Sequence, residues 1–147
     1  ILGDGVILAN CVSLAGHVIL EDHVIAGGLV GIHQFCRVGK YAFLAGGAMV
    51  TRNILPYTIA QGDRAEHAGI NIVGLSRAGW SKQDIQAVRR GYQSIFYGEG
   101  TRQEMLERTE RNGAKESTVI AGLCAFIRAA ERGISPARKK VEGGTPA

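Results

Sequence analysis

The side chains best suited to chemistry lie close together in the stretch from Gly16 to Gln34, GHVILEDHVIAGGLVGIHQ. His17, His23 and His33 contribute imidazoles, which can exchange a proton near neutral pH, and Gln34 contributes a carboxamide. Gly16 contributes a backbone N–H that no side chain shields. Such groups can bind a polar substrate and accept a proton, provided that the fold brings them to one place.

The elements that carry these residues repeat every six positions. An aliphatic residue or alanine opens each of nine consecutive units from Leu2 to Val50, and the next position is mostly small. A period of six is neither the helical period of 3.6 nor the strand period of two. Internal repetition of this kind predicts a solenoid, in which each unit buries its apolar residue by stacking on its neighbours. The fifth position is also small or β-branched in every unit: Val6, Val12, Val18, Val24, Val30, Cys36, Ala42, Ala48 and Ile54.

These hexads resemble those of the hexapeptide-repeat proteins, whose fold is a left-handed parallel β-helix. In that family three hexads form one triangular coil, so residues eighteen apart lie above one another at a spacing of about 4.8 Å. The resemblance implies that Gln34 lies directly above Gly16, next to His17. Because His17 and His23 are six apart, we expect them on different faces, where they cannot share a ligand within one chain. We expect His23 to be a surface or interface residue.

The six-residue pattern becomes irregular after Val50, and the following residues predict a last, irregular coil. Helical spacing then predicts three helices, over residues 81–96, 101–111 and 119–130. We expect the helices to cap the open end of the solenoid. The predicted fold class is mainly β, with three parts: a left-handed parallel β-helix over residues 1–75, a C-terminal α-helical bundle over 76–133, and a basic, disordered tail over 134–147.

Composition limits the classes of function. The 147 residues suit one domain with a small appendage, and 17 Lys and Arg against 13 Asp and Glu give a net charge of +4. This charge suits anionic small molecules or an acidic protein partner and is weak evidence for nucleic acid. No apolar run approaches the ~20 residues of a membrane span and no signal peptide is visible, so we expect a cytoplasmic protein. The cysteines, Cys11, Cys36 and Cys124, lack metal-ligand spacing, so we expect reduced, structural thiols.

Several strings resemble one family in particular: LAGHV, GGLVGIHQFCRVG, LPYTIAQGDRA and GINIVGLSRAGWS. From Leu2 to about Arg132 the sequence is similar to the UDP-N-acetylglucosamine O-acyltransferases that open lipid A biosynthesis. The resemblance implies transfer of a 3-hydroxyacyl chain from acyl carrier protein to the 3-hydroxyl of UDP-N-acetylglucosamine. It also implies a homotrimer with active sites between neighbouring prisms, and direct transfer that needs no metal, cofactor or covalent intermediate.

The same resemblance implies roles for individual residues. Gly16 would donate its backbone N–H to the oxyanion, and its lack of a side chain would let the thioester carbonyl approach. His17, His33 and Gln34 would contact the sugar or the acyl donor. From the residues alone, an outward histidine is more often a surface or packing residue, and His33 could only pack a corner.

Three further residues match the family at some distance along the chain. Asn71 and Arg77 would hold the nucleotide and its phosphates, for which a guanidinium fork is suited. Gly46 would stand where side-chain size helps to set the length of the acyl chain. Read without the family, Arg77 could be a solvated charge and Gly46 a turn residue.

The sequence also departs from the family pattern. The family's catalytic histidine lies in an H-x-x-H-D string that would fall two residues upstream of Ile1, and none of the four histidines occupies its register. We therefore expect the chain to be the C-terminal part of the enzyme without its general base. Ala78 replaces a second basic residue, and Val73 replaces a carboxylate that some relatives use.

The sequence leaves three alternatives open. The related UDP-3-O-acyl-glucosamine N-acyltransferase shares the β-helix and the acyl donor, but normally carries an N-terminal uridine-binding domain. A zinc hydratase built on trimeric β-helices needs three histidines converging across an interface, a spacing that this chain does not match. The third alternative is an inactive, purely structural trimer.

Overall fold

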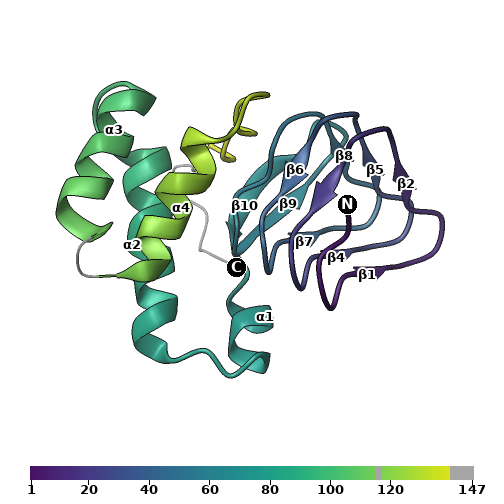
Figure 1. Cartoon of the computed structure of the whole chain (residues 1–147), viewed down its shortest axis with the longest axis horizontal. Coiled ribbons are helices and arrows are strands. Elements are labelled where there is room, and N and C mark those ends of the chain that lie inside the picture. Colours follow the sequence, from purple (N-terminus) through teal and green to yellow (C-terminus); the bar gives the residue numbers. More distant parts are fainter. Residues whose placement is uncertain (115–116, 140–147) are drawn as a thin grey trace.

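The computed structural model describes residues 1–114 and 117–139. Figure 1 shows a column of stacked coils on one side and a group of helices on the other. The coils consist of two-residue strands joined by corners, and a longer antiparallel pair closes the column. The strands are β1 (Ile7–Leu8), β2 (Ser13–Leu14), β3 (Ile19–Leu20), β4 (Ile25–Ala26), β5 (Gly31–Ile32), β6 (Arg37–Val38), β7 (Phe43–Leu44), β8 (Met49–Val50), β9 (Thr58–Gln61) and β10 (Glu66–Ile70).

Strands of successive coils stack into three sheets. Their orders are β1-β4-β7-β9-β10, β2-β5-β8 and β3-β6, and every pairing between coils is parallel. The chain therefore visits three faces in turn before it rises to the next coil. This arrangement confirms the prediction of a β-solenoid built from hexads.

The interior of the solenoid contains the residues that the six-residue pattern predicts. A fully buried Leu, Ile or Val contributes about 1.5–3 kcal/mol, so the stability of the column comes from many small units stacked together. The buried first-position residues are Leu20, Ala26, Ile32, Val38, Leu44 and Val50. The buried fifth-position residues are Val18, Val24, Val30, Cys36, Ala42 and Ala48.

The register between coils is eighteen residues until the last coil, where it falls to sixteen. Ile7 lies below Ile25, and Ile25 lies below Phe43, whereas Phe43 pairs with Ile59. Ile54 likewise forms its bridge with Val38, sixteen residues before it. The assignment of Ile54 to the fifth position is therefore wrong. The corner before Ile54 is two residues shorter than the others, so Ile54 occupies the first position of its unit, above Val38.

Each six-residue unit of the solenoid contains one corner residue in the left-handed region, whereas the shortened corner over residues 51–53 contains none. At a non-glycine residue this conformation costs roughly 1–2 kcal/mol. The cost is offset where the N–H of the corner residue donates to a carbonyl of the coil below, as Phe35 N does to Gly16 O (3.0 Å) and Tyr41 N to Asp22 O (3.0 Å). The corner residues, with φ between 57° and 73°, are Gly5, Cys11, His17, His23, Leu29, Phe35, Tyr41, Gly47 and Tyr57.

Helices follow the strands, close to the predicted bounds. They are α1 (Ile72–Arg77), α2 (Lys82–Tyr97), α3 (Arg102–Thr109), the π-helix η1 (Glu110–Ala114) and α4 (Thr118–Arg128). The Ser81 hydroxyl caps α2 by accepting from Asp84 N, and Thr101 and Glu104 form a capping box on α3. Helices α2, α3 and α4 contact one another, and α2 also contacts β10. Within residues 1–114 and 117–139, no helix has the length and apolar character of a membrane span.

A buried histidine joins the strands, the helices and the segment that follows α4. His67 is inaccessible to solvent; its Nε2 accepts from Leu55 N (2.9 Å), and its Nδ1 donates to Ser135 O (2.9 Å). The Tyr92 hydroxyl of α2 donates to His67 O (3.3 Å).

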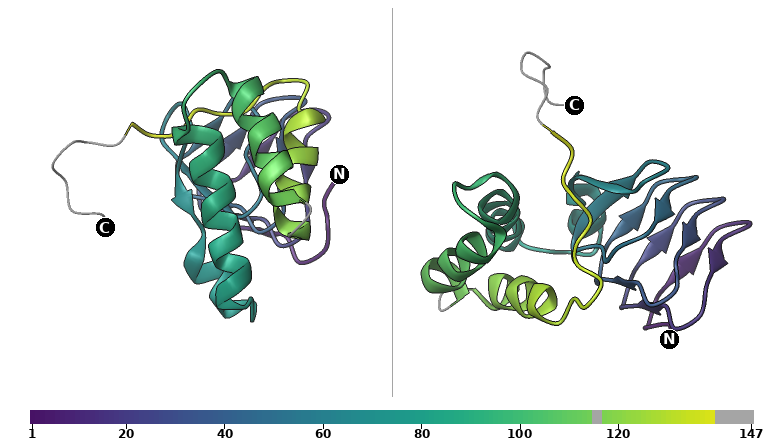
Figure 2. Two further views of the ribbon diagram at one scale, coloured as in Figure 1. Left: turned by 90° about the vertical axis from the view of Figure 1, so that its left-hand side faces the viewer. Right: turned by 90° about the horizontal axis from the view of Figure 1, so that it is seen from above.

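The segment after α4 differs from the predicted disordered tail. Ile134 forms a bridge with Asn53, Ala137 forms one with His67, and Ser135 is buried. Figure 2 shows this segment running back across the end of the solenoid. Disorder is therefore the wrong prediction for residues 134–138, because their backbone groups satisfy His67 and the last coil. The rest of the predicted tail, residues 140–147, lies outside the described residues.

Candidate active site

The predicted group around Gly16 does converge on one corner, between β2 and β3 and between β5 and β6. We call this the His17 corner and define it by Gly16, His17, Gln34 and Phe35. Gly16 and Gln34 precede the corner residues His17 and Phe35, which lie one coil apart and whose rings stack with centroids 4.9 Å apart. The imidazole of His17 and the carboxamide of Gln34 are both exposed on this corner.

Gly16 offers the open backbone that the prediction requires. A Cβ atom at this position would meet nothing within 4 Å, so the space in front of the residue is free. Its carbonyl accepts from Phe35 N (3.0 Å), whereas its N–H donates to no group in the described part of the chain. An N–H of this kind can stabilise a developing oxyanion.

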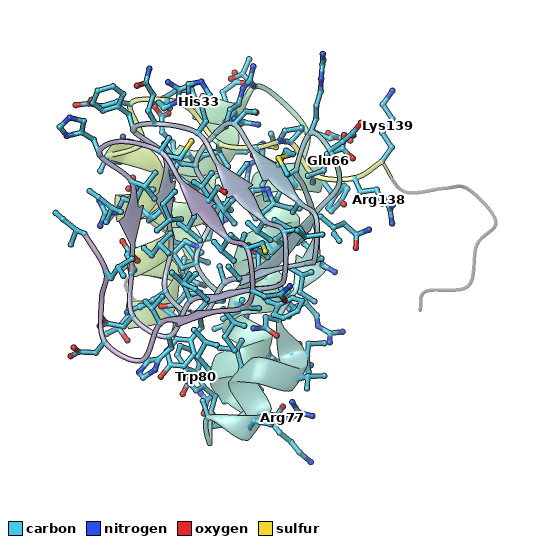
Figure 3. The ribbon with its side chains drawn as sticks, turned by 90° about the vertical axis from the view of Figure 1, so that its right-hand side faces the viewer. His33, Glu66, Arg77, Trp80, Arg138 and Lys139 are labelled. Carbon is cyan, nitrogen blue, oxygen red and sulfur yellow. The ribbon has the colours of Figure 1, made fainter. Side chains whose placement is uncertain are left out.

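His33 lies beside the corner rather than in it. Its ring is exposed and its Nδ1 lies 3.2 Å from Gln34 O, while its N–H donates to Val50 O (2.8 Å) in the coil above. Figure 3 shows the His33 side chain pointing away from the column. His33 is thus free to contact a molecule lying along the His17 corner.

Asn71 has a structural role that the sequence did not reveal. Its carboxamide NH₂ donates to Tyr41 O (2.9 Å), its carboxamide oxygen accepts from Gly74 N (3.1 Å), and the residue is buried. Asn71 therefore caps α1 and ties it to the solenoid. Arg77, in the last turn of α1, is exposed. By fixing the start of α1, Asn71 limits the positions that the Arg77 guanidinium can reach. The contact of Asn71 and Arg77 with a nucleotide stays a prediction.

Gly46 lies on yet another corner, between β7 and β8. A Cβ atom there would touch only Gly28 O, at 3.5 Å, so a side chain could be added without moving the backbone. Any larger side chain would project from the surface of this corner. This is the environment expected of a position that limits how far a ligand extends.

The predicted site residues therefore occupy three different corners of one prism. Gly16, His17 and Gln34 share the first corner, Gly46 lies on the second, and α1 with Arg77 lies on the third. Figure 3, which looks along the column, shows His33 and Arg77 on opposite sides of the molecule. One copy of the chain does not bring these residues to a single site.

Two further features were not found from the sequence. Phe35 shares the His17 corner although its residue type suggests no chemistry. A cavity of about 540 Å³ opens between the solenoid and the helices, lined in part by Lys40, Tyr57, Trp80 and Asp84. Its walls come from segments far apart in sequence, so no local pattern could indicate it.

Cys36 fills the core, as its fifth position predicts. Its thiol is buried against the neighbouring coils, and this burial raises the thiol pKa. A raised pKa lowers the thiolate fraction, which is the opposite of what a nucleophile needs. Within the described residues, no three His, Cys, Asp or Glu side chains are grouped as metal ligands.

The solenoid of hexads defines a class, the hexapeptide-repeat proteins. Residues 53–135 match the family model described as UDP-N-acetylglucosamine O-acyltransferase, domain 2, and this match covers more than half of the chain. The chain belongs to that family.

Relatives and solved structures agree with this assignment. The acyl-[acyl-carrier-protein]–UDP-N-acetylglucosamine O-acyltransferase of Alkalilimnicola ehrlichii is 44% identical over 133 residues, which are 90% of this chain and 51% of the relative. That of Myxococcus xanthus is 48% identical over 118 residues, or 80% and 45%. The UDP-N-acetylglucosamine acyltransferase structure from Bacteroides fragilis has a TM-score of 0.86 and 36% identity over 90% of this chain and 52% of that one. The chain spans about half the length of the curated relatives it matches.

Proposed function

We propose that this chain forms the C-terminal part of an enzyme that transfers a 3-hydroxyacyl chain from acyl carrier protein to the 3-hydroxyl of UDP-N-acetylglucosamine, the first step of lipid A biosynthesis. The family match supports the proposal, because the relatives carry this acyl donor and acceptor in their names. The same relatives favour O-acyl over N-acyl transfer. We propose for the protein the cytoplasmic location, the left-handed coil and the helical bundle that the family resemblance implies.

The observation that carries the proposal is the open N–H of Gly16 beside two exposed polar side chains, His17 and Gln34. In the proposed reaction the sugar hydroxyl attacks the thioester carbonyl and gives its proton to a general base. The carbonyl oxygen becomes an oxyanion, which accepts a hydrogen bond from Gly16 N–H. The tetrahedral intermediate then expels the thiolate of the carrier protein, which takes up the proton, and an ester remains on the sugar.

His17 and Gln34 are proposed to hold the reactants rather than to take the proton. In the family the general base lies one coil before Gly16, in a register that none of this chain's histidines occupies. Holding the hydroxyl near the carbonyl lowers the entropic part of the barrier, and small misplacements are costly. The nearby His33 is proposed to add a further contact to the sugar or the acyl donor.

We further propose that the active enzyme is a homotrimer. The separation of Gly16, Gly46 and Arg77 on three corners supports this, because a site that uses all of them needs more than one copy of the chain. In the trimer, one copy would supply the His17 corner, while a neighbour would supply α1 with Asn71 and Arg77, which would hold the nucleotide phosphates.

Two substitutions test the assignment in the full-length protein. We expect His17→Ala and Gln34→Ala each to lower the turnover of acyl transfer by more than about tenfold while leaving the trimer intact, as checked by light scattering. His23→Ala is the matched control, since His23 has the same residue type and corner conformation on another corner. Wild-type rates in both test variants would refute the site.

A further inference from the structure

The rings of His17 and Phe35 lie almost parallel, in contact, on the His17 corner. Their centroids are 4.9 Å apart and their planes differ by 4°. The equivalent pair on the next corner, His23 and Tyr41, is close at 4.7 Å but tilted by 30°. Parallel stacking fixes the plane of an imidazole while leaving its edge, and so both nitrogens, open.

The backbone explains why these two rings meet. His17 and Phe35 are eighteen residues apart, which is one coil, and both have left-handed φ angles, 59° and 64°. Their Cβ atoms therefore leave the corner in similar directions, one above the other. The hydrogen bond from Phe35 N to Gly16 O (3.0 Å) fixes the spacing of the two turns.

The stack is what orients the imidazole of His17. Neither ring nitrogen of His17 makes a hydrogen bond to any group in residues 1–114 or 117–139. Phe35 in turn is 54% exposed and belongs to none of the buried clusters. Its ring contributes little to the core, so its most specific contact is with His17.

We propose that Phe35 is a positioning residue, which holds the His17 imidazole in one orientation beside the Gly16 N–H so that its nitrogens face the reactants. This inference rests on the proposed function, in which His17 contacts the sugar or the acyl donor. Phe35 itself touches no reacting atom in the proposal. Its effect on catalysis must therefore pass through His17.

A double-mutant cycle in the full-length protein tests that dependence. Phe35→Leu removes the flat ring, and leucine is compatible with the corner because Leu29 adopts the same conformation, with φ 64°, on the adjacent corner. We expect Phe35→Leu to lower kcat by about tenfold, Phe35→Tyr to restore most of it, and Phe35→Leu to add almost nothing in a His17→Ala background. An unchanged kcat, or an equal loss in both backgrounds, would overturn the proposal.

The stack can be measured without any activity. In an NMR spectrum of the protein with labelled histidine, ring-current shielding by Phe35 places the His17 ring protons upfield. We expect these protons to move downfield in Phe35→Leu and to stay in place in Leu29→Ala, the control for loss of an exposed corner residue. Unmoved His17 signals in Phe35→Leu would refute the stack. If the stack is seen but the wild-type enzyme transfers no acyl group, the proposed function fails instead.

Discussion

Acid should destabilise this protein through His67. Burial lowers the pKa of this imidazole from 6.5 to about 4, because a charged ring would lose its hydration and the hydrogen bond that Nε2 accepts from Leu55 N. The folded state therefore binds fewer protons than the unfolded state between these two values. The contribution to stability is fully present above pH 6.5 and is lost as the pH falls toward 4.

The size of the effect follows from the two pKa values. Between pH 7.5 and pH 5.0, a pKa of 6.5 in the unfolded chain and about 4 in the folded one corresponds to about 2 kcal/mol of lost unfolding free energy. The carboxyl pKa values of Glu104 and Glu110 are also lowered, by the cap at Thr101 and by Arg128 respectively. Their linked stability is lost below the usual carboxyl range, so it lies outside this window.

Urea unfolding at pH 7.5 and pH 5.0 measures the effect at one protein concentration. His67→Gln is the matched variant, because its amide can still accept and donate hydrogen bonds but does not titrate. The exposed histidines are common to both proteins and cancel. We expect the wild type to lose about 2 kcal/mol more than the variant between the two pH values. Equal losses would refute a neutral, buried His67 as the source of acid sensitivity.

Three other outcomes are expected. Gly46→Met should shorten the acyl chain that the full-length enzyme prefers, because the side chain would project into open space beside the corner; an unchanged profile of acyl donors would remove Gly46 from this role. Asn71→Ala should lower the unfolding free energy by about 1 kcal/mol through loss of the α1 cap. It should also raise KM for the nucleotide sugar, as Arg77→Ala should. A normal KM in Asn71→Ala would show that the cap does not contribute to nucleotide binding. An aromatic disulfide reagent should react with exposed Cys11 far faster than with buried Cys36, and equal rates under native conditions would contradict the packing of the coil.

The solenoid could be predicted from the sequence because every coil before the last obeys the same rule. First positions such as Leu20 and Leu44 are buried in the same core cluster, so one pattern describes them all. The last coil breaks the rule: its corner is two residues shorter, which moves Ile54 from the fifth to the first position, and only the stacking of the chain shows this. The ordered structure of residues 134–138 could not be predicted from the local sequence either, since it depends on a contact with His67, more than sixty residues away.

The candidate site was predictable in part for a similar reason. Gln34 follows Gly16 by one coil, so the repeat alone brings them together. The pairing of Phe35 with His17 depends on left-handed φ angles at these two residues. Such angles cannot be predicted from the residue types His and Phe. The role of Asn71 as a cap depends on Tyr41 O, thirty residues earlier, and so on the finished fold.

The most direct test is to identify the product that the full-length protein forms from 3-hydroxyacyl carrier protein and UDP-N-acetylglucosamine. Mass spectrometry should show one 3-hydroxyacyl group added to the nucleotide sugar, and hydroxylamine should cleave the ester bond and release that group as a hydroxamic acid. Such a product, formed more than about tenfold more slowly by Gln34→Ala and at the wild-type rate by His23→Ala, is the expected result. Absence of acyl transfer to this acceptor, or formation only of an amide on an amino sugar, would contradict it.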